Sequence, residues 1–268
     1  ESPHEPGVFW AGSDDGLVHV SRDGGDTWEN VTPAGLPEWT TVGNIEVSPH
    51  DRATAYLAGS RYRLDDNTPY LYKTVDYGKT WTGITAGLPE DGFTRVVRAD
   101  RVQEGLLYAG TETGPWVSFD DGGSWQPLQC DLPVVPIHDM AVKDNELVAA
   151  THGRSFWILD DLSLLRQLKA EHAGSGARLF RPSDSIRRAP AMDWTRPREG
   201  KVYAQSVGAP AIYDYRPMPN GEVVRSMLNA GSNPPEGVVV TYYLGQQHQG
   251  EVSVAVLDSQ GQLIKEFS

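Results

Sequence analysis

SRDGGDTW (Ser21–Trp28), TVDYGKTW (Thr74–Trp81) and SFDDGGSW (Ser118–Trp125) are copies of one octapeptide, (S/T)-x-D-x-G-x-(S/T)-W, and this pattern decides the fold. An acid, a glycine and a tryptophan recur at the same offsets in all three copies, which chance does not explain. Repeats separated by tens of residues are typical of arrays in which each repeat is one supersecondary unit. The chain is therefore predicted to be a repeat protein.

The sequence around each octapeptide repeats as well. An apolar stretch that ends in small residues precedes each copy, as VFWAGS (8–13), AYLAGS (55–60) and LLYAGT (106–111). A polar turn and a second apolar stretch lead into the octapeptide, and Gly-Leu-Pro or Asp-Leu-Pro follows it. Four short strands per repeat is the arrangement of a propeller blade. The sequence thus predicts an all-β fold made of four-stranded blades.

A fourth unit lacks a complete octapeptide. The stretch 147–161 aligns on 107–121 but has lost the glycine and the tryptophan, and SLLRQLKAEH (163–172) is predicted to form a short helix. Residues 1–172 therefore hold about three and a half blades, whereas closed propellers have about four to eight. We expect the missing blades of the same propeller to precede Glu1. An open blade edge is also expected to make the isolated chain self-associate.

The remainder of the chain differs in composition. Residues 173–220 are rich in proline and arginine and show no sustained period, so they are predicted to be a connector lying on acidic propeller surface. Strand patterns return in 221–268, where the turn DSQGQ is predicted to join the last two strands as a hairpin. We expect this segment to be the start of an immunoglobulin-like β-sandwich that the sequence truncates.

Composition excludes several classes of function. The net charge of −13 argues against nucleic acid as a partner, because phosphate binding requires a basic face. Cys130 is the only cysteine, so no intrachain disulfide can form, and its side chain is predicted to be small, apolar and buried. No apolar run is long enough to span a membrane. The octapeptides lack the full ligand spacing of calcium loops, and we expect no metal and no cofactor.

Every conserved position of the octapeptide has a local structural role. The aspartate can accept hydrogen bonds from backbone N–H groups of its own turn, and the glycine supplies a positive φ. The hydroxyl before the tryptophan can close the turn, and the indole can pack between adjacent sheets. We therefore predict structural rather than catalytic roles for Ser21, Asp23, Gly25, Thr27, Trp28, Thr74, Asp76, Gly78, Thr80, Trp81, Ser118, Asp120, Gly122, Ser124 and Trp125.

Topology indicates where a ligand would bind. The octapeptide lies between the third and fourth strands of a blade, so the turns between the second and third strands lie on the opposite side, which we call the loop face. The loops that join blades, 33–41, 89–94 and 132–138, open on the same face. Propellers usually bind through loops held on a rigid scaffold. The candidate ligand residues on this face are Asp14, Asp15, Arg61, Arg63, Asp65, Asp66, Glu112, His152 and Arg154.

His152 and Arg154 form the sharpest local candidate, THGRSFW (151–157). A histidine and an arginine on either side of a glycine could hold an anionic or sugar ligand, or move a proton. A structural alternative is also open. Arg154 could pair with a carboxylate that locks the last blade to the first, and His152 could cap a turn.

The octapeptides resemble the Asp-box of bacterial-neuraminidase-type (BNR) repeats. Together with ATHGRSFWILDDLSLLRQL (149–167) and GSNPPEGVVVTYYL (231–244), they resemble secreted bacterial Asp-box propellers of the sortilin-type or glycosyl-hydrolase-like kind. The resemblance implies a propeller, a connector and an immunoglobulin-like module, in an extracellular or periplasmic protein. Such family names follow the repeat and say little about substrate.

Two features depart from the better known members of this group. Sortilins carry a cysteine-rich module after the propeller, and this chain has a single cysteine. Sialidases need clustered arginines at the propeller centre, and here the arginines concentrate in the connector, with only Arg61, Arg63 and Arg154 on the loop face. Xyloglucanase-type enzymes use paired aspartates from different blades, which Asp14 or Asp15 with Asp65 or Asp66 could mimic.

Three hypotheses follow. The first is a non-catalytic binding or scaffold propeller that recognises a protein or a glycan through the loop face. The second is a glycoside hydrolase, sialidase-like or xyloglucanase-like, whose catalytic acids lie partly in missing blades. The third is a piece that only links propeller and sandwich, with no ligand.

Overall fold

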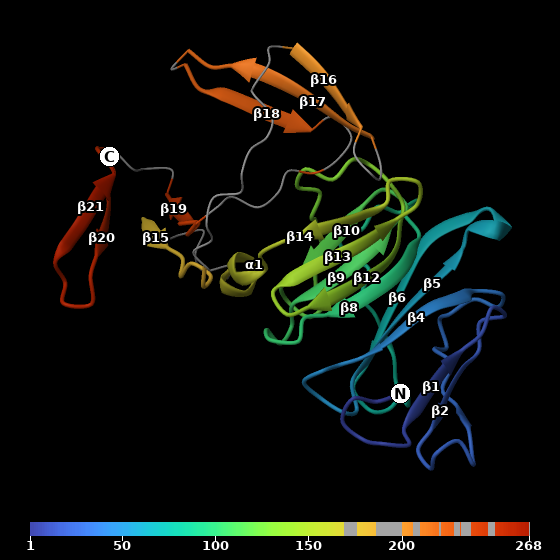
Figure 1. The fold of residues 1–268 in the computed structure, drawn as a ribbon. Coiled ribbons are helices and arrows are strands. Elements are labelled where there is room, and N and C mark those ends of the chain that lie inside the picture. The colour runs from blue at the N-terminus through green and yellow to red at the C-terminus, as the bar shows by residue number, and fades with distance from the viewer. Residues whose placement is uncertain are drawn as a thin grey trace.

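Strands make up nearly all of the regular structure in the described part of the chain (Figure 1). The computed structural model describes residues 1–168, 176–185, 200–205, 210–219, 221–227, 231, 237–245 and 250–267. Within these residues no helix is long and apolar enough to cross a membrane.

Four antiparallel sheets follow one another along residues 9–159, and each is a propeller blade. Blade 1 consists of β1 (Phe9–Gly12), β2 (Val18–Ser21) and β3 (Glu29–Asn30). Blade 2 consists of β4 (Thr41–Val47), β5 (Ala55–Arg61), the 3-10 helix η1 (Tyr62–Leu64), β6 (Asp66–Thr74) and β7 (Thr82–Gly83).

Blades 3 and 4 continue the same arrangement. Blade 3 consists of β8 (Thr94–Ala99), β9 (Leu107–Thr111), β10 (Pro115–Ser118) and β11 (Gln126–Pro127). Blade 4 consists of β12 (Ile137–Lys143), β13 (Glu146–Thr151) and β14 (Phe156–Leu159). The strands of each blade pair in chain order, and β8 contacts both β4 and β12, so first strands adjoin at the inner ends of blades. The predicted partial β-propeller is confirmed.

The hydrophobic core lies between successive blades rather than inside one. One cluster joins blades 1 and 2 around Val18, Val20 and Leu57, and similar clusters join blades 2 and 3 and blades 3 and 4. Middle strands are therefore covered on both faces, and β9 is buried at every residue instead of alternating. A strand covered on both faces is a continuous apolar run, which explains LLYAG in the sequence.

Each octapeptide turn is closed by the same hydrogen bonds. The aspartate Oδ1 accepts from the backbone N–H four residues later, at 2.9 Å for Asp23, 2.9 Å for Asp76 and 2.8 Å for Asp120. The first hydroxyl of each turn donates to the same carboxylate and accepts from the glycine N–H. The glycines have φ values of 99°, 85° and 87°, which an L side chain rarely adopts. These contacts all lie within the turn itself and hold its shape.

The octapeptide tryptophans join each blade to the one before it. Trp81 donates its indole N–H to the carbonyl of Val31 in blade 1, and Trp125 donates to Ile84 in blade 2, both at 2.6 Å. Trp28 in blade 1 has no described blade before it and donates to Gly25 of its own turn. Its exposure is 46%, against 3% for Trp125. The role of the indole therefore depends on a neighbouring blade.

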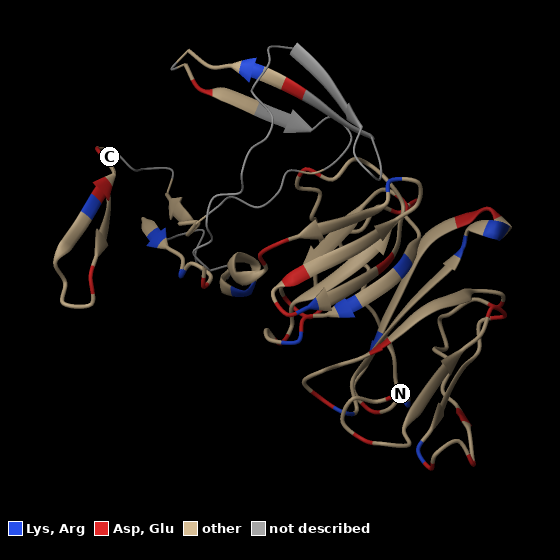
Figure 2. Ribbon diagram, viewed as in Figure 1, with Lys and Arg blue, Asp and Glu red and all other residues tan. Residues whose placement is uncertain are grey.

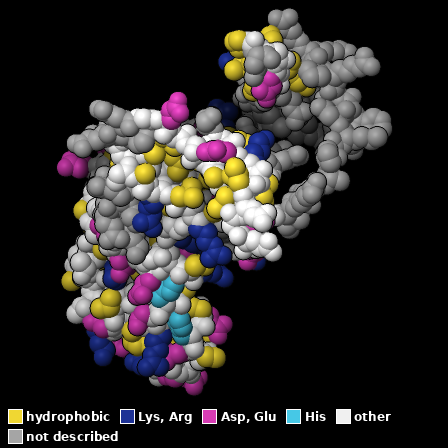
Figure 3. All heavy atoms as spheres, turned by 90° about the vertical axis from the view of Figure 1, so that its left-hand side faces the viewer, with side chains coloured by type: hydrophobic (Ala, Val, Ile, Leu, Met, Phe, Trp, Pro, Cys, Tyr) yellow, Lys and Arg dark blue, Asp and Glu magenta, His cyan; other side chains and the backbone are white. Residues whose placement is uncertain are grey.

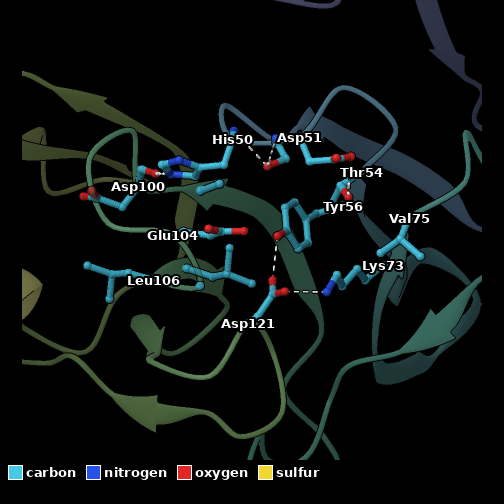
Figure 4. A pocket seen from close by; sticks show the side chains of 14 residues that line it. His50, Asp51, Thr54, Tyr56, Lys73, Val75, Asp100, Glu104, Leu106 and Asp121 are labelled. Atoms are coloured by element: carbon cyan, nitrogen blue, oxygen red, sulfur yellow. Dashed lines mark hydrogen bonds and ion pairs between the residues drawn. The ribbon is translucent and has the colours of Figure 1, made fainter. Parts of the chain in front are cut away.

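The residue between the aspartate and the glycine of each octapeptide makes a further contact. Gly24, Tyr77 and Asp121 all have positive φ. The N–H of Gly24 donates to Gly7, just before β1, and those of Tyr77 and Asp121 donate to carbonyls in the turn between the first two strands of their blades. The side chains reach the preceding blade. Tyr77 donates to Glu5 at 2.7 Å, and Asp121 accepts from Tyr56 at 2.6 Å and pairs with Lys73 (Figure 4). The side chains at this position therefore differ: a tyrosine bonds to a glutamate between blades 1 and 2, and an aspartate bonds to a tyrosine and a lysine between blades 2 and 3.

A second repeat, Ser-Pro-His, lies on the octapeptide side of blades 1 and 2. The Nε2 atom of His4 lies 2.9 Å from the carbonyl oxygen of Ser48, and that of His50 lies 2.7 Å from the carbonyl oxygen of Asp100. A carbonyl only accepts, so both imidazoles donate through Nε2 to the next blade. Figure 3 shows the side of the molecule where histidine side chains lie among acidic and basic ones.

Blade 4 ends in the helix α1 (Ser163–Gln167) instead of a fourth strand. The predicted helix 163–172 is thus seen over its first residues, and 169–172 lie outside the described residues. Leu162 is fully buried, and the Nε atom of Arg166 lies 3.0 Å from the buried Asp100 carboxylate of blade 3. The Arg166–Asp100 ion pair takes the place of the tryptophan contact that joins the other blades.

The C-terminal strands form small separate sheets. They are β15 (Ala177–Leu179), β16 (Gly200–Gln205), β17 (Pro210–Pro217), β18 (Val223–Met227), β19 (Tyr242–Leu244), β20 (Val254–Leu257) and β21 (Leu263–Phe267). β15 pairs with β19, β16, β17 and β18 form one sheet, and the predicted hairpin of β20 and β21 is confirmed.

The segment predicted as a connector contains strands. β16 and β17 lie within 173–220, and β18 follows on the other side of the predicted boundary. The alternation in KVYAQ and AIYDYRP carries this signal, which the surrounding prolines and arginines obscured. The connector arginines Arg187, Arg188, Arg196 and Arg198 lie outside the described residues. The immunoglobulin-like module stays a prediction.

The prediction for Cys130 was wrong. The side chain is exposed, not buried. The residue has a φ of 42° in the loop between blades 3 and 4, where a left-handed turn directs the chain around the blade edge. A loop position of this kind lies outside the core whatever the polarity of its side chain.

Replacing Trp125 by alanine should lower the free energy of unfolding by about 3–5 kcal/mol, because a buried indole and its hydrogen bond are both lost. Trp28→Ala is the matched control and should cost less than about 1 kcal/mol, since that indole is exposed. Urea unfolding followed by circular dichroism measures both. Equal losses in the two variants would contradict the proposed role of the preceding blade.

Candidate functional site

The first strands of blades 2, 3 and 4 each contain a β-bulge near the loop face. The pairing register shifts between Val42 and Asn44 in β4, between Thr94 and Val96 in β8, and between Ile137 and Asp139 in β12. The extra residues are Gly43, Arg95 and His138. A bulge redirects a side chain out of the normal alternation and is frequent next to functional sites. Two of the three redirected residues can carry charge.

The bulge residues meet the residues that follow the second strand of the same blade. In blade 3, the Nη2 atom of Arg95 lies 3.0 Å from Oε2 of Glu112. In blade 4, the rings of His138 and His152 lie with their centroids 4.7 Å apart at an angle of 56°. We call Arg95, Glu112, His138 and His152 the inner rim, since they lie at the loop-face ends of the first and second strands of blades 3 and 4.

Blade 2 leaves its part of the rim open. Its bulge residue is Gly43, and a Cβ atom there would lie 2.8 Å from the carbonyl oxygen of Arg95. The glycine therefore permits the close approach of β8 that places Arg95. Arg61, at the position equivalent to Glu112, turns instead to Asp66, with Nη1 2.6 Å from the carboxylate.

Two aromatic rings orient the Arg95 guanidinium. Tyr62 in η1 stacks on Phe93 with ring centroids 5.0 Å apart and an interplanar angle of 12°. The Arg95 Cζ atom lies 4.9 Å from the Tyr62 centroid and 4.8 Å from that of Phe93. Cations near aromatic faces are attracted by the ring quadrupole. Arg95 is thus fixed by blades 2 and 3 together.

The rim combines one ion pair, Arg95–Glu112, with the two histidines His138 and His152. Desolvation lowers the pKa of His138, and the charges of Arg95 and His152 lower it further, while Glu112 acts in the opposite direction. Tyr62 also has a lowered pKa, through hydrogen bonds and charge from Arg63 first and then Arg95. Charges of both signs also lie at the turn between β5 and β6 (Figure 2).

Asp66 and Asp15 have structural partners. Desolvation opposes ionisation of Asp66, but hydrogen bonds from Tyr70, Thr68 and Arg61 outweigh it and hold its pKa at about 2. A hydrogen bond from the Ser13 hydroxyl lowers the pKa of Asp15. Both carboxylates are therefore committed to the turns that carry them.

The other predicted loop-face residues are less constrained. Asp65 ends η1 in the left-handed region at a φ of 56°, and Asp14 lies exposed in the turn between β1 and β2. Arg63 lies over Tyr62, with 5.6 Å between its Cζ atom and the ring centroid. Among the described residues the Arg154 side chain has no ion pair, so the predicted lock between blades is not seen there.

A charged network below the rim joins three blades. Arg98 in β8 lies 3.0 Å from Glu46 in β4 and 2.7 Å from Asp139 in β12, and its Nε donates to the Met140 carbonyl at 2.6 Å. Desolvation raises the pKa of Glu46, and the Arg98 charge opposes the rise. This network holds the inner strands together beneath the rim.

A hollow lies on the octapeptide side between blades 2 and 3. It has a volume of about 290 Å³ and is lined by His50, Tyr56, Lys73 and Asp121 among others (Figure 4). Three of its polar side chains, Tyr56, Asp121 and Lys73, bond to one another, as Figure 4 shows. Among the described residues no group of three or more histidine, cysteine, aspartate or glutamate side chains could hold a metal ion.

The sequence predicted Glu112 and His152 as site residues but not Arg95. It placed His138 only at the end of the loop 132–138. Arg95 and His138 lie inside strands, where a polar residue is normally taken for the exposed side. The signal was present in TRVVRA (94–99), because the adjacent buried Val96 and Val97 break strict alternation and mark an irregular strand.

No protein-family model matches this chain. No curated protein matches it either. Among solved structures, YCF48 bound to the D1 peptide is 20% identical with a TM-score of 0.45, over 57% of this chain and 46% of that one. The GH74 xyloglucanase from Xanthomonas campestris is 18% identical with a TM-score of 0.47, over 60% of this chain and 28% of that one.

An ancestral GH74 enzyme is 14% identical with a TM-score of 0.47, over 99% of this chain and 31% of that one. The chain thus spans less than half the length of each of these proteins. Likeness at this level says nothing about what the chain binds, and the fold assignment rests on the blades described above.

Arg98→Met should lower the free energy of unfolding by about 2 kcal/mol at pH 7. This value lies between the losses typical of exposed and of buried ion pairs, because Arg98 and Glu46 are both only partly exposed. Removing Arg98 raises the pKa of Glu46 further. Since a carboxyl with a raised folded-state pKa favours folding in acid, the loss should shrink as pH falls toward 4.5 and grow as pH rises.

Urea unfolding at pH 4.5 and pH 7 measures this difference. The double variant Glu46→Gln/Arg98→Met is the control, and its stability change should not depend on pH in this way. A loss of equal size at both pH values in Arg98→Met would show that Glu46 is not coupled to Arg98.

Proposed function

We propose that this chain is part of a non-catalytic binding propeller of a secreted protein, which recognises a protein or glycan ligand at the inner rim of the loop face. The observation that carries the proposal is the pair of bulges that bring Arg95 and His138 to Glu112 and His152. These polar groups converge at the inner end of a rigid set of blades, where propellers present ligand-binding loops.

The rim retains unused hydrogen-bonding capacity. Arg95 directs both Nε and Nη2 to the same oxygen of Glu112, at 3.4 Å and 3.0 Å. Within the described part of the chain, Arg95 uses one oxygen of the Glu112 carboxylate, and neither imidazole of the His138–His152 pair donates or accepts a hydrogen bond. Converging donors and an acceptor without partners suit a polar ligand. In the octapeptide-side hollow, by contrast, Tyr56, Asp121 and Lys73 already pair with one another.

The acids favour binding over glycoside hydrolysis. A glycosidase needs one carboxyl with a raised pKa as the general acid and a second, ionised one across a cleft. On the loop face, Asp15 and Asp66 have lowered pKa values. Within the described residues the acid with a raised pKa is Glu46, which is bonded to Arg98 below the rim.

Glycan and peptide arrays probed with the chain test the proposal. For the ligand found, Arg95→Ala and Glu112→Gln should each weaken binding at least tenfold, about 1.4 kcal/mol, while Lys79→Ala on the octapeptide side is the matched control and should leave it unchanged. Binding that survives both rim substitutions would contradict the site. Turnover of a polysaccharide that is lost in Glu112→Gln would favour the hydrolase hypothesis instead.

A further inference from the structure

β14 is the outer strand of blade 4, and it lacks the neighbour that the equivalent strand has in the other blades. Blades 1, 2 and 3 each end in a short outer strand, β3, β7 or β11, which pairs with the strand before it. The sheet of blade 4 has the order β12-β13-β14, and after β14 the chain enters α1 instead of turning back. Among the described residues, therefore, no strand covers the outer edge of β14.

The pairing register identifies a backbone group that this leaves open. In blade 2, the Leu71 carbonyl accepts from the N–H of Ile84 at 2.9 Å, and in blade 3, the Pro115 carbonyl accepts from Leu128 at the same distance. Phe156 is the equivalent residue in blade 4, because all three pair with the second-strand residue opposite the first residue after the bulge. Within the described part of the chain, the Phe156 carbonyl has no such donor.

Two large apolar side chains lie beside this open edge. Phe156 is 71% exposed and Ile158 is 51% exposed, and they share one face of β14 because they alternate with Trp157. Trp157 lies on the opposite face, where a Cβ atom on Gly231 would come within 3.0 Å of its ring. Proteins usually protect an edge strand with a charge, a proline or a bulge, and β14 (FWIL) has none of these. The edge is thus left open to pairing.

Charges of opposite sign lie at the two ends of the edge. Arg154 lies in the turn before β14 and Asp160 follows β14 directly, and both are exposed. Within the described residues neither forms an ion pair. An antiparallel strand on this edge would begin beside Asp160 and end beside Arg154, because β14 runs in the opposite direction. The matching strand is therefore basic at its start, apolar at alternate positions and acidic at its end.

We propose that the outer edge of β14 binds an extended segment of a partner protein, which adds to blade 4 as its missing outer strand. The segment runs antiparallel to β14, donates a backbone N–H to the Phe156 carbonyl and places apolar side chains beside Phe156 and Ile158. Strand addition takes its affinity from main-chain hydrogen bonds and its specificity from alternate side chains.

This edge is a different site from the inner rim. It belongs to the outer strand of blade 4, whereas the rim residues lie at the ends of the first and second strands of blades 3 and 4. The inference therefore goes beyond the proposed function and does not rest on it.

Fluorescence anisotropy with the labelled peptide Lys-Thr-Val-Thr-Val-Thr-Glu, capped at both ends, tests the inference. Its two valines would lie opposite Ile158 and Phe156, and we expect saturable binding. N-methylation of the second valine removes the N–H that faces the Phe156 carbonyl and should weaken binding at least tenfold. N-methylation of the threonine before it is the matched control and should change the affinity less than about threefold, because that N–H faces away from β14.

Substitutions in the protein locate the site. Ile158→Lys should weaken peptide binding at least tenfold, because a charge replaces the apolar side chain beside the paired edge. Val134→Lys is the matched control and should leave binding unchanged, since Val134 is 77% exposed in the loop between blades 3 and 4. Arg95→Ala in the inner rim should leave it unchanged as well, which separates this site from the proposed one.

Several results would overturn the inference. Equal binding of the two methylated peptides would show that the edge forms no main-chain hydrogen bonds, and binding unaffected by Ile158→Lys would place the peptide elsewhere. Absence of peptide binding by a monomeric chain would overturn it too. Sedimentation velocity tests the other occupant: a dimer that binds no peptide and that Ile158→Lys dissociates would show that a second copy of the chain takes the edge instead.

Discussion

The structure depends on one constraint, which is that each octapeptide turn bonds its own aspartate and directs its tryptophan toward the preceding blade. Asp76 and Asp120 bind the backbone of their own turns, and Trp81 and Trp125 then donate to carbonyls of blades 1 and 2. Because the core lies between blades, this contact also sets how the apolar faces meet. Where the octapeptide is lost, in blade 4, a buried ion pair from α1 replaces it.

The two sides of the blades consequently have different chemistry. On the octapeptide side, the turn hydroxyls, the octapeptide aspartates and the two Ser-Pro-His histidines make contacts within and between blades. At the inner rim on the opposite side, the imidazoles of His138 and His152 have no hydrogen-bond partner among the described residues. Because repeated hydrogen bonds hold the octapeptide side together, the residues on the loop face can differ between proteins without loss of the fold.

The features that repeat along the sequence could be predicted from it, but the features that depend on the pairing register of the strands could not. The octapeptides, the blades and the loop face follow from spacing, because the same residues recur at the same offsets. The bulges at Arg95 and His138 were not predicted, because one extra residue in a short strand leaves its composition unchanged. The Ser-Pro-His contacts were missed because two copies of a short pattern give a weak signal. The burial of Cys130 was predicted wrongly, because the polarity of a side chain does not indicate that its residue lies in a loop with a left-handed backbone.

The central claim is that the octapeptide acids are hydrogen-bond acceptors of the fold and not reactive groups. NMR titration of the carboxyl carbons measures this directly. Hydrogen bonds from Thr27 and Ser21 should hold the pKa of Asp23 at about 2, and the equivalent bonds should keep Asp76 and Asp120 below the ordinary value of 3.8. A pKa at or above 3.8 for any of the three would contradict the account, because it would mean that the turn does not bind the charged form.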